Sequence, residues 1–255
     1  GNYDGSIKTI QAGDGFKGHM FSIDNYANLG LSSVNLDGNG QCQLFYCSQS
    51  GSEEGTETDQ DLPTGTLTME NCTVTNFAGT ADSGIITMAT GGKMTISGCT
   101  FNSNYVHDKG AIYLISGTLN LNIVNIDDLL DSTLTSINTN SFNDYVTNGS
   151  PNAPANPCEI YLKGTGTFNG TNEFVNTAID AVHVAGWTTL TLNGKYYSGS
   201  EEALKIYSTT DGSISNEKSK NTINVDDKEK VTIDDGGDIN KQTPTYKTSI
   251  FKSTN

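Results

Sequence analysis

The chain has 255 residues, a formal net charge of −15 and a hydrophobic fraction of only 34%. This acidity argues against nucleic acid as a partner, because binding to a phosphate backbone requires concentrated positive charge. The apolar residues are too few for a large core that covers both faces of a sheet, and too regularly spaced for a disordered chain. The composition therefore favours an all-β solenoid, whose core is a narrow column, in an extracellular or cell-surface protein.

No segment approaches the length of a membrane-spanning helix, and residues 1–20 lack the basic start and apolar centre of a signal peptide. We therefore expect no membrane span in this segment, and we expect the chain to be a mature or excised part of a larger surface protein.

Two kinds of short strand recur in the same order from the N-terminus onward. Strands of the first kind alternate apolar and polar residues, and we expect them at 33–40, 66–72, 93–99, 118–124, 159–166, 188–194, 222–227 and 230–235. Strands of the second kind are shorter and are expected at 19–23, 43–47, 84–88, 110–114, 181–184 and 203–206. Neighbouring units repeat every 22–27 residues, except where polar segments intervene at 48–65 and 127–157. We expect these two segments to be long loop insertions and the main places of partner contact.

This repeat predicts a single β-helix domain over residues 1–255, with about eight coils stacked ~4.8 Å apart. We expect it to be parallel and right-handed, because parallel crossover connections nearly always have that hand. An antiparallel sandwich explains the alternation but not the fixed order of the two strand types. In the β-helix, like positions form one inward column: Phe21, Phe45, Ile86, Ile112, Val182 and Leu204.

Residues 98–114, GCTFNSNYVHDKGAIYL, form one such coil and contain the tetrapeptides FNSN (101–104) and KGAI (109–112). This pair resembles the FxxN and GGA[ILV] repeats of the polymorphic outer-membrane protein family, with Lys109 in place of a glycine. The resemblance implies a surface-displayed, adhesin-like β-helix.

The same coil carries His107, Asp108 and Lys109 in the connection between its strands, where we predict a solvated turn. The alternative is a weak site in which Asp108 stacks on Asp82 of the preceding coil, with His107 beside them. His183 lies in a strand between two inward valines, so we predict that it points outward as an ordinary surface residue.

A carbohydrate-active enzyme on a β-helix is the main alternative function. The chain contains no Arg, because all 14 of its basic residues are Lys, so the usual arginine-dependent machinery of pectate lyases and pectin methylesterases is absent. Paired acids occur at 127–128, 226–227 and 234–235, but the NTD and GHG motifs of polygalacturonases do not. We assign no catalytic residue and favour a non-enzymatic protein.

The segment NLDGNG (35–40) matches part of a calcium-loop pattern, which makes Asp37 and Asn39 candidate Ca²⁺ ligands. The twelfth loop position, where a bidentate acid is usual, holds Tyr46. A tight turn between strands explains the same residues.

The chain has five cysteines, of which Cys72 and Cys99 occupy equivalent places in adjacent coils. Such residues stack as a buried ladder of free thiols or form a disulfide, and we favour the ladder.

These observations predict an extracellular, non-enzymatic scaffold that acts in adhesion or surface structure and binds carbohydrate or another host or cell-surface ligand. The alternatives are a polysaccharide hydrolase or lyase and a self-assembling fibre or surface-layer component. The candidate residues for stacking on sugars are Tyr46, Tyr105, Tyr113, Trp187, Tyr196 and Tyr197.

Overall fold

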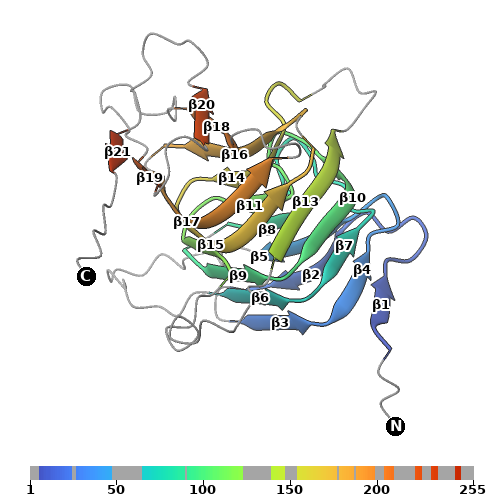
Figure 1. The fold of residues 1–255 in the computed structure, drawn as a ribbon. Helices are drawn as coiled ribbons and strands as arrows, with labels where there is room; N and C mark the ends of the chain where they lie inside the picture. The colour runs from blue at the N-terminus through green and yellow to red at the C-terminus, as the bar shows by residue number, and fades with distance from the viewer. Residues whose placement is uncertain are drawn as a thin grey trace, which may run out of the picture.

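All regular elements in the described part of the chain are β-strands, and each strand pairs with its neighbours in parallel (Figure 1). None of these residues forms a helix long and apolar enough to cross a membrane. The computed structural model describes residues 6–24, 27–47, 65–89, 91–122, 139–146, 154–176, 178–186, 188–198, 204–209, 222–225, 231–234 and 245–247.

The strands form two curled sheets, and the first of these has two runs joined by long strands. One run contains β3 (Asn28–Ser32), β6 (Thr66–Glu70), β9 (Lys93–Ser97) and β12 (Thr118–Leu121). The other contains β1 (Lys8–Gln11), β4 (Val34–Asp37), β7 (Thr73–Thr75), β10 (Thr100–Val106) and β13 (Thr139–Val146). The first part of β15 (Thr165–Phe174) pairs with β12 and its last part pairs with β13. Beyond β15 the sheet continues through β17 (Thr189–Ser198), β19 (Thr222–Val225) and β21 (Thr245–Lys247).

The second sheet takes one short strand from each passage of the chain. Its strands are β2 (His19–Ile23), β5 (Gln43–Cys47), β8 (Ile86–Met88), β11 (Ile112–Leu114), β14 (Cys158–Leu162), β16 (Asp180–Ala185), β18 (Leu204–Thr209) and β20 (Val231–Asp234). The chain thus returns to the same sheets in the same order, one strand spacing further along. This parallel, curled arrangement agrees with the predicted β-solenoid and excludes the antiparallel sandwich.

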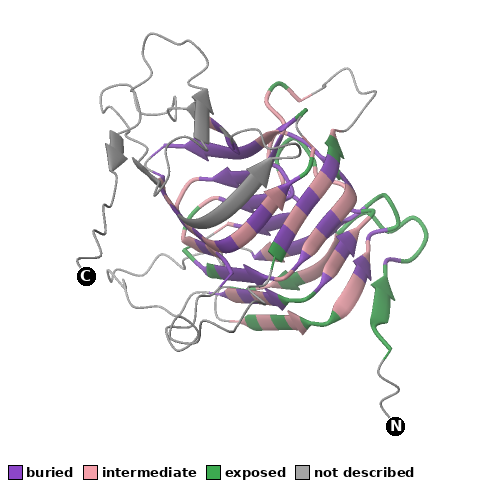
Figure 2. Ribbon diagram, in the orientation of Figure 1, coloured by how far each residue is buried: buried purple, intermediate pink, exposed green. Residues whose placement is uncertain are grey.

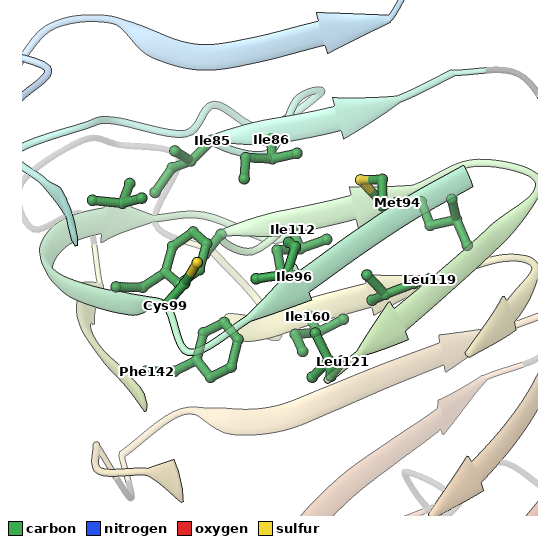
Figure 3. Close-up of a cluster of buried hydrophobic side chains, with 14 of the residues drawn as sticks. Ile85, Ile86, Met94, Ile96, Cys99, Ile112, Leu119, Leu121, Phe142 and Ile160 are labelled. Atoms are coloured by element: carbon green, nitrogen blue, oxygen red, sulfur yellow. The ribbon is translucent and has the colours of Figure 1, made fainter. Parts of the chain in front are cut away.

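Side chains of both sheets alternate between an inner and an outer face, and the inner ones meet in one apolar column. Figure 3 shows isoleucines of the second sheet opposite Met94, Leu119 and Leu121 of the first sheet. The observed inward column of the second sheet is Phe21, Phe45, Ile86, Ile112, Ile160, Val182 and Ile206. The prediction of Leu204 was therefore wrong by two residues, and Ile160 was missed, because β14 belongs to this sheet rather than to the first.

The FNSN tetrapeptide is a structural element of the column. The Phe101 ring stacks on Phe142 of the next coil, and Phe142 stacks on Phe174, with ring centroids 5.0 Å apart in both pairs. Buried Asn104 accepts a hydrogen bond from the backbone N–H of Phe77 and donates one to the carbonyl of Val74. The tetrapeptide therefore places one ring and one amide in the interior, where each binds a neighbouring coil.

The GAI part of the second tetrapeptide turns the chain into β11. Gly110 has φ +70°, and a Cβ at this position would lie 2.7 Å from the backbone oxygen of Glu159. Ala111 and Ile112 are buried directly after it. A glycine is required here for both backbone conformation and space.

A second buried ladder consists of asparagine side chains at the bend between the two runs of the first sheet. Asn140 accepts a hydrogen bond from the backbone N–H of Cys99 and donates to the carbonyl of Ile96. Its amide also donates to the side-chain oxygens of Asn122 and Asn172, at 3.1 and 3.0 Å. The amides thus satisfy backbone groups that turn inward at the bend.

The predicted insertion at 127–157 is only partly a loop. Its residues 139–146 form β13, which pairs with β10 and β15 in the first sheet, and the remainder lies mostly outside the described residues. The predicted insertion at 48–65 also lies outside them, except for residue 65.

Candidate functional site

Two exposed tyrosines lie side by side on the outer face of the first sheet. Tyr105 on β10 and Tyr145 on β13 are register partners, and they are 44% and 49% exposed. Figure 2 shows the alternation of buried and accessible positions along these strands. Two adjacent exposed rings form a contiguous apolar patch, so the pair is a candidate contact surface.

A bulge in β10 sets the direction of these rings. The register between β10 and β13 shifts between Asn102 and Tyr105, and Ser103 adopts a left-handed backbone with φ +60°. The extra residue turns Asn104 into the core and Tyr105 outward. Without the bulge, Tyr105 would not align with Tyr145.

Polar amides accompany the tyrosines on the same outer face. The side chain of Asn143 donates a hydrogen bond to the side-chain oxygen of Asn102, at 3.0 Å. Each amide has further donors and acceptors beyond this one bond. Ring faces beside oriented amides suit a sugar, whose C–H face stacks on the rings while its hydroxyls bond to the amides.

Two acidic side chains are buried behind this surface. Asp144, on β13 between Asn143 and Tyr145, is 0% exposed, and Glu159 at the start of β14 is 1% exposed. Oδ1 of Asp144 accepts hydrogen bonds from the backbone and side-chain nitrogens of Asn104, at 3.0 and 2.8 Å. Oε1 of Glu159 accepts from the backbone N–H of Asp144, at 3.2 Å. The acids therefore lie together inside the corner that carries the tyrosines.

Burial is the main influence on both acids. It raises the pKa of Asp144 to about 6, against the lowering effect of the bonds from Asn104. It also raises the pKa of Glu159 well above its usual range, and the nearby charge of Asp144 raises it further. The pair therefore holds protons to higher pH than exposed carboxyl groups do.

Sequence reasoning missed Tyr145, Asp144 and Glu159. The signal was the similarity of TFNSNYV (100–106) and SFNDYV (141–146), which differ in length by the one bulge residue. Aligning them with a one-residue gap would have placed Tyr145 on Tyr105 and Asp144 on Asn104.

The predicted solvated turn at 107–109 is wrong for His107, which is only 9% exposed. Its Nδ1 accepts a hydrogen bond from the backbone N–H of Asp108 at 2.9 Å, so this nitrogen does not donate to the carboxylate 3.3 Å away. That carboxylate accepts a bond from the backbone of Asn156. The contacts of Asp108 hold the chain before β14 and do not form a catalytic pair.

The outer face of the second sheet carries a ladder of rings. Tyr161 contacts His183 with ring centroids 4.3 Å apart, and His183 contacts Tyr207 at 4.8 Å. The amino group of Lys109 lies 4.4 Å from the centre of the Tyr161 ring. His183 points outward as predicted, between two buried valines, but it is covered by these rings and only 7% exposed, so the prediction of a surface residue was wrong. Tyr113 is also 7% exposed, so the prediction of sugar stacking there was wrong.

Among the other predicted stacking residues, Tyr46 lies on β5, with its ring centroid 4.8 Å from that of His19. Trp187 lies outside the described residues, and Tyr196 and Tyr197 belong to β17 by their backbone. Only Tyr105 of that set is a clearly exposed ring in the described chain.

Asp37 and Asn39 come together in a turn after β4. The carboxylate of Asp37 accepts hydrogen bonds from Gln11, Asn76 and the backbone of Asn39. Asn39 has φ +52° and donates its side-chain amide to Asp14, at 3.0 Å. These bonds satisfy Asp37 as a turn residue, and a Ca²⁺ role for the two residues stays a prediction. No group of three or more His, Cys, Asp or Glu side chains suited to a metal occurs in the described part of the chain.

All five cysteines are buried free thiols. Cys72 donates to the carbonyl oxygens of Leu31 and Glu70, and Cys99 donates to that of Ser97. A hydrogen bond with Cys72, together with burial, raises the pKa of the Cys99 thiol. The structure therefore has the ladder of thiols rather than the disulfide.

We expect the folded protein to react slowly with a thiol reagent such as dithionitrobenzoate, because burial restricts access to all five sulfur atoms. This should hold even for Cys72, whose pKa is lowered to about 6 by its hydrogen bond with Cys99. In denaturant all five thiols should react at once. Counting released thiolate with and without denaturant checks this. A denatured count of three, with no reducing agent present, would instead indicate a disulfide.

The resemblance of residues 101–112 to polymorphic outer-membrane protein repeats rests on two short motifs. In this chain, core packing explains FNSN, and the turn at Gly110 explains KGAI. Compared with protein-family models, curated proteins and solved structures, the chain has no match.

Proposed function

We propose that the chain is a right-handed β-helix of about eight coils that serves as an extracellular, non-enzymatic adhesion scaffold. Its exposed pair Tyr105 and Tyr145 binds carbohydrate. The register of the two tyrosines on adjacent strands is the observation that carries the proposal.

The surroundings of the pair support a rigid binding surface. Phe142 and Asp144, which flank Asn143 on β13, are fully buried, so the strand that carries Tyr145 is fixed from inside. Rings held on a sheet lose little conformational freedom on binding. The net charge of −15 repels acidic polymers. The proposed ligand is therefore a neutral polysaccharide or a neutral glycan of a cell surface.

Replacing Tyr145 by Ala should weaken retention on the neutral polysaccharide that binds best by about tenfold, since one stacking contact is lost. Tyr105→Ala should act similarly. Affinity electrophoresis of the full chain across a panel of neutral and acidic polysaccharides measures this.

Tyr145→Phe is the matched control, because it keeps the ring and should keep most of the affinity. Phe16→Ala removes an exposed ring (43% exposed) that precedes β2, and it should have no effect. Equal retention of the wild type and both tyrosine-to-alanine variants would refute the proposed surface. Depolymerisation of a polysaccharide by the chain, with or without Ca²⁺, would contradict the non-enzymatic scaffold and support the alternative of a carbohydrate-active enzyme.

Self-association is a second candidate, favoured by the first coil. The strand orders of the two sheets begin or end at β1, β2 and β3, and Ile7, Ile10 and Phe16 are exposed nearby. Open edges of this kind pair with other chains when nothing covers them. Light scattering that shows mass increasing with protein concentration would support assembly as a function of this end.

A further inference from the structure

In the buried acid pair Asp144 and Glu159, each carboxyl group has one oxygen with hydrogen bonds and one without. One oxygen of each carboxyl group accepts backbone or amide N–H bonds, as described above. The other oxygens, Oδ2 of Asp144 and Oε2 of Glu159, are buried and have no hydrogen-bond donor. Two orphaned acceptors in one place are costly, because each has lost its bonds to water.

Few charged groups stand near the pair to balance it. Asn104 on β10 and Asn176 after β15 are neutral and contact Asp144. Cys158 is next to Glu159, and the charges of Asp180, Asp108 and Lys109 influence the pKa of its thiol. Lys109 is the one cation of that group, and its amino group lies over the rings of Tyr113 and Tyr161. Two ionised acids would thus be a net negative charge in the interior.

One proton on the pair would lower the cost of both the unbonded oxygens and the buried charge. A proton on one acid turns one of its oxygens into a donor, for which the adjacent acid offers acceptors, and it removes one of the two buried negative charges. The two residues are adjacent, because the backbone N–H of Asp144 bonds to Oε1 of Glu159 at 3.2 Å, and each acid affects the pKa of the other. A cation is a poorer solution, since Ca²⁺ takes about six to eight oxygen ligands and no third acidic, His or Cys ligand joins the pair among the described residues.

We propose that Asp144 and Glu159 share one proton inside the folded scaffold near neutral pH, and that the corner that carries Tyr105 and Tyr145 loses stability as rising pH favours ionisation of the pair. The pair then acts as a pH-sensitive device built into the coil. This proposal does not depend on carbohydrate binding.

The direction of the pH effect follows from linkage. Both acids have raised pKa values in the folded chain, whereas in the unfolded chain they ionise near pH 4. The folded state therefore binds more protons than the unfolded state above that pH, and stability falls as pH rises. With the pKa of Asp144 at about 6, most of its loss comes between pH 4 and pH 7. Glu159 extends the loss to higher pH.

Urea unfolding of the full chain between pH 4.5 and 8.5 tests the proposal. The contribution of the pair to the unfolding equilibrium constant of the wild type should rise on the order of a hundredfold over this range, because a two-unit pKa shift corresponds to that factor. Glu159→Gln removes one buried titratable group and offers an amide N–H to Asp144, so it should flatten this rise and exceed the wild type in stability at pH 8. Glu173→Gln, a half-buried acid on β15, should keep the wild-type profile.

Infrared spectroscopy of the folded protein gives an independent reading. At pH 7 the wild type and Glu173→Gln should show the C=O band of a protonated carboxyl group, and Glu159→Gln should lack it. Absence of the band from the wild type, or parallel stability profiles for the wild type and Glu159→Gln, would overturn the proposal. Stabilisation of the wild type by Ca²⁺ at pH 8, absent from Glu159→Gln, would also overturn it in favour of a cation.

Discussion

Replacing Phe142 by Ala should lower the free energy of unfolding by about 3–5 kcal/mol, the usual cost of removing a buried ring. Phe142 is fully buried and lies in the middle of a stack, with its centroid 5.0 Å from both Phe101 and Phe174. Its removal leaves a cavity between two rings held by separate strands, so the coils cannot close over the space. Urea denaturation followed by circular dichroism measures the loss.

Tyr145→Ala is the internal control for this variant, because it removes a ring three residues away on the outer face of the same strand. It should change stability by about 1 kcal/mol or less. Equal destabilisation by the two substitutions would contradict the assignment of Phe142 to the inner face of β13.

Asn140→Ala should cost about 2–4 kcal/mol, since it leaves several buried polar groups without partners. The amide accepts from the backbone of Cys99 and donates to the carbonyl of Ile96. It also links Asn122 to Asn172 on neighbouring coils. Alanine cannot replace any of these bonds, and a buried site offers no free access to water. Thermal and urea unfolding measure the effect.

Asn143→Ala provides the comparison for Asn140→Ala. Asn143 lies on the same strand but faces outward, and its amide bonds to Asn102 in a partly buried position. Water can replace that bond, so the expected cost is about 1 kcal/mol or less. If the outer variant were the more destabilised of the two, the buried asparagine ladder would not be a main support of the bend.

The all-β class and the parallel, curled sheets followed from the repeat period and from the fixed order of strands. The assignment of individual strands was less secure, because alternation identifies the inner face of a strand but not the sheet it joins. Residues 159–166 match the first kind of strand by their pattern, whereas Cys158–Leu162 form β14 of the second sheet beside strands of the second kind. Likewise, 33–40 and 66–72 were treated as equivalent, although β4 and β6 belong to different runs.

The candidate site was harder to predict for a related reason. Tyr105 and Tyr145 align only because of the bulge at Ser103, and a one-residue shift in register reverses every side chain of a strand. Nor does the sequence mark Asp144 as buried, since an Asp beside Asn143 and Tyr145 reads as part of a polar turn. Asp144 is buried because it occupies the position equivalent to Asn104 on the next strand and bonds to it, and this alignment depends on the same register.

The ten-residue strand β15 has a mechanical consequence. In the preceding coils the two runs of the first sheet are separate short strands, whereas β15 crosses the bend between the runs and pairs with β17 along its whole length. A pull on either run is therefore carried by one continuous backbone into the other, and ten register pairs share the load in shear. In the proposed adhesion scaffold, this continuous strand places resistance to shear beside the strands that carry the exposed tyrosines.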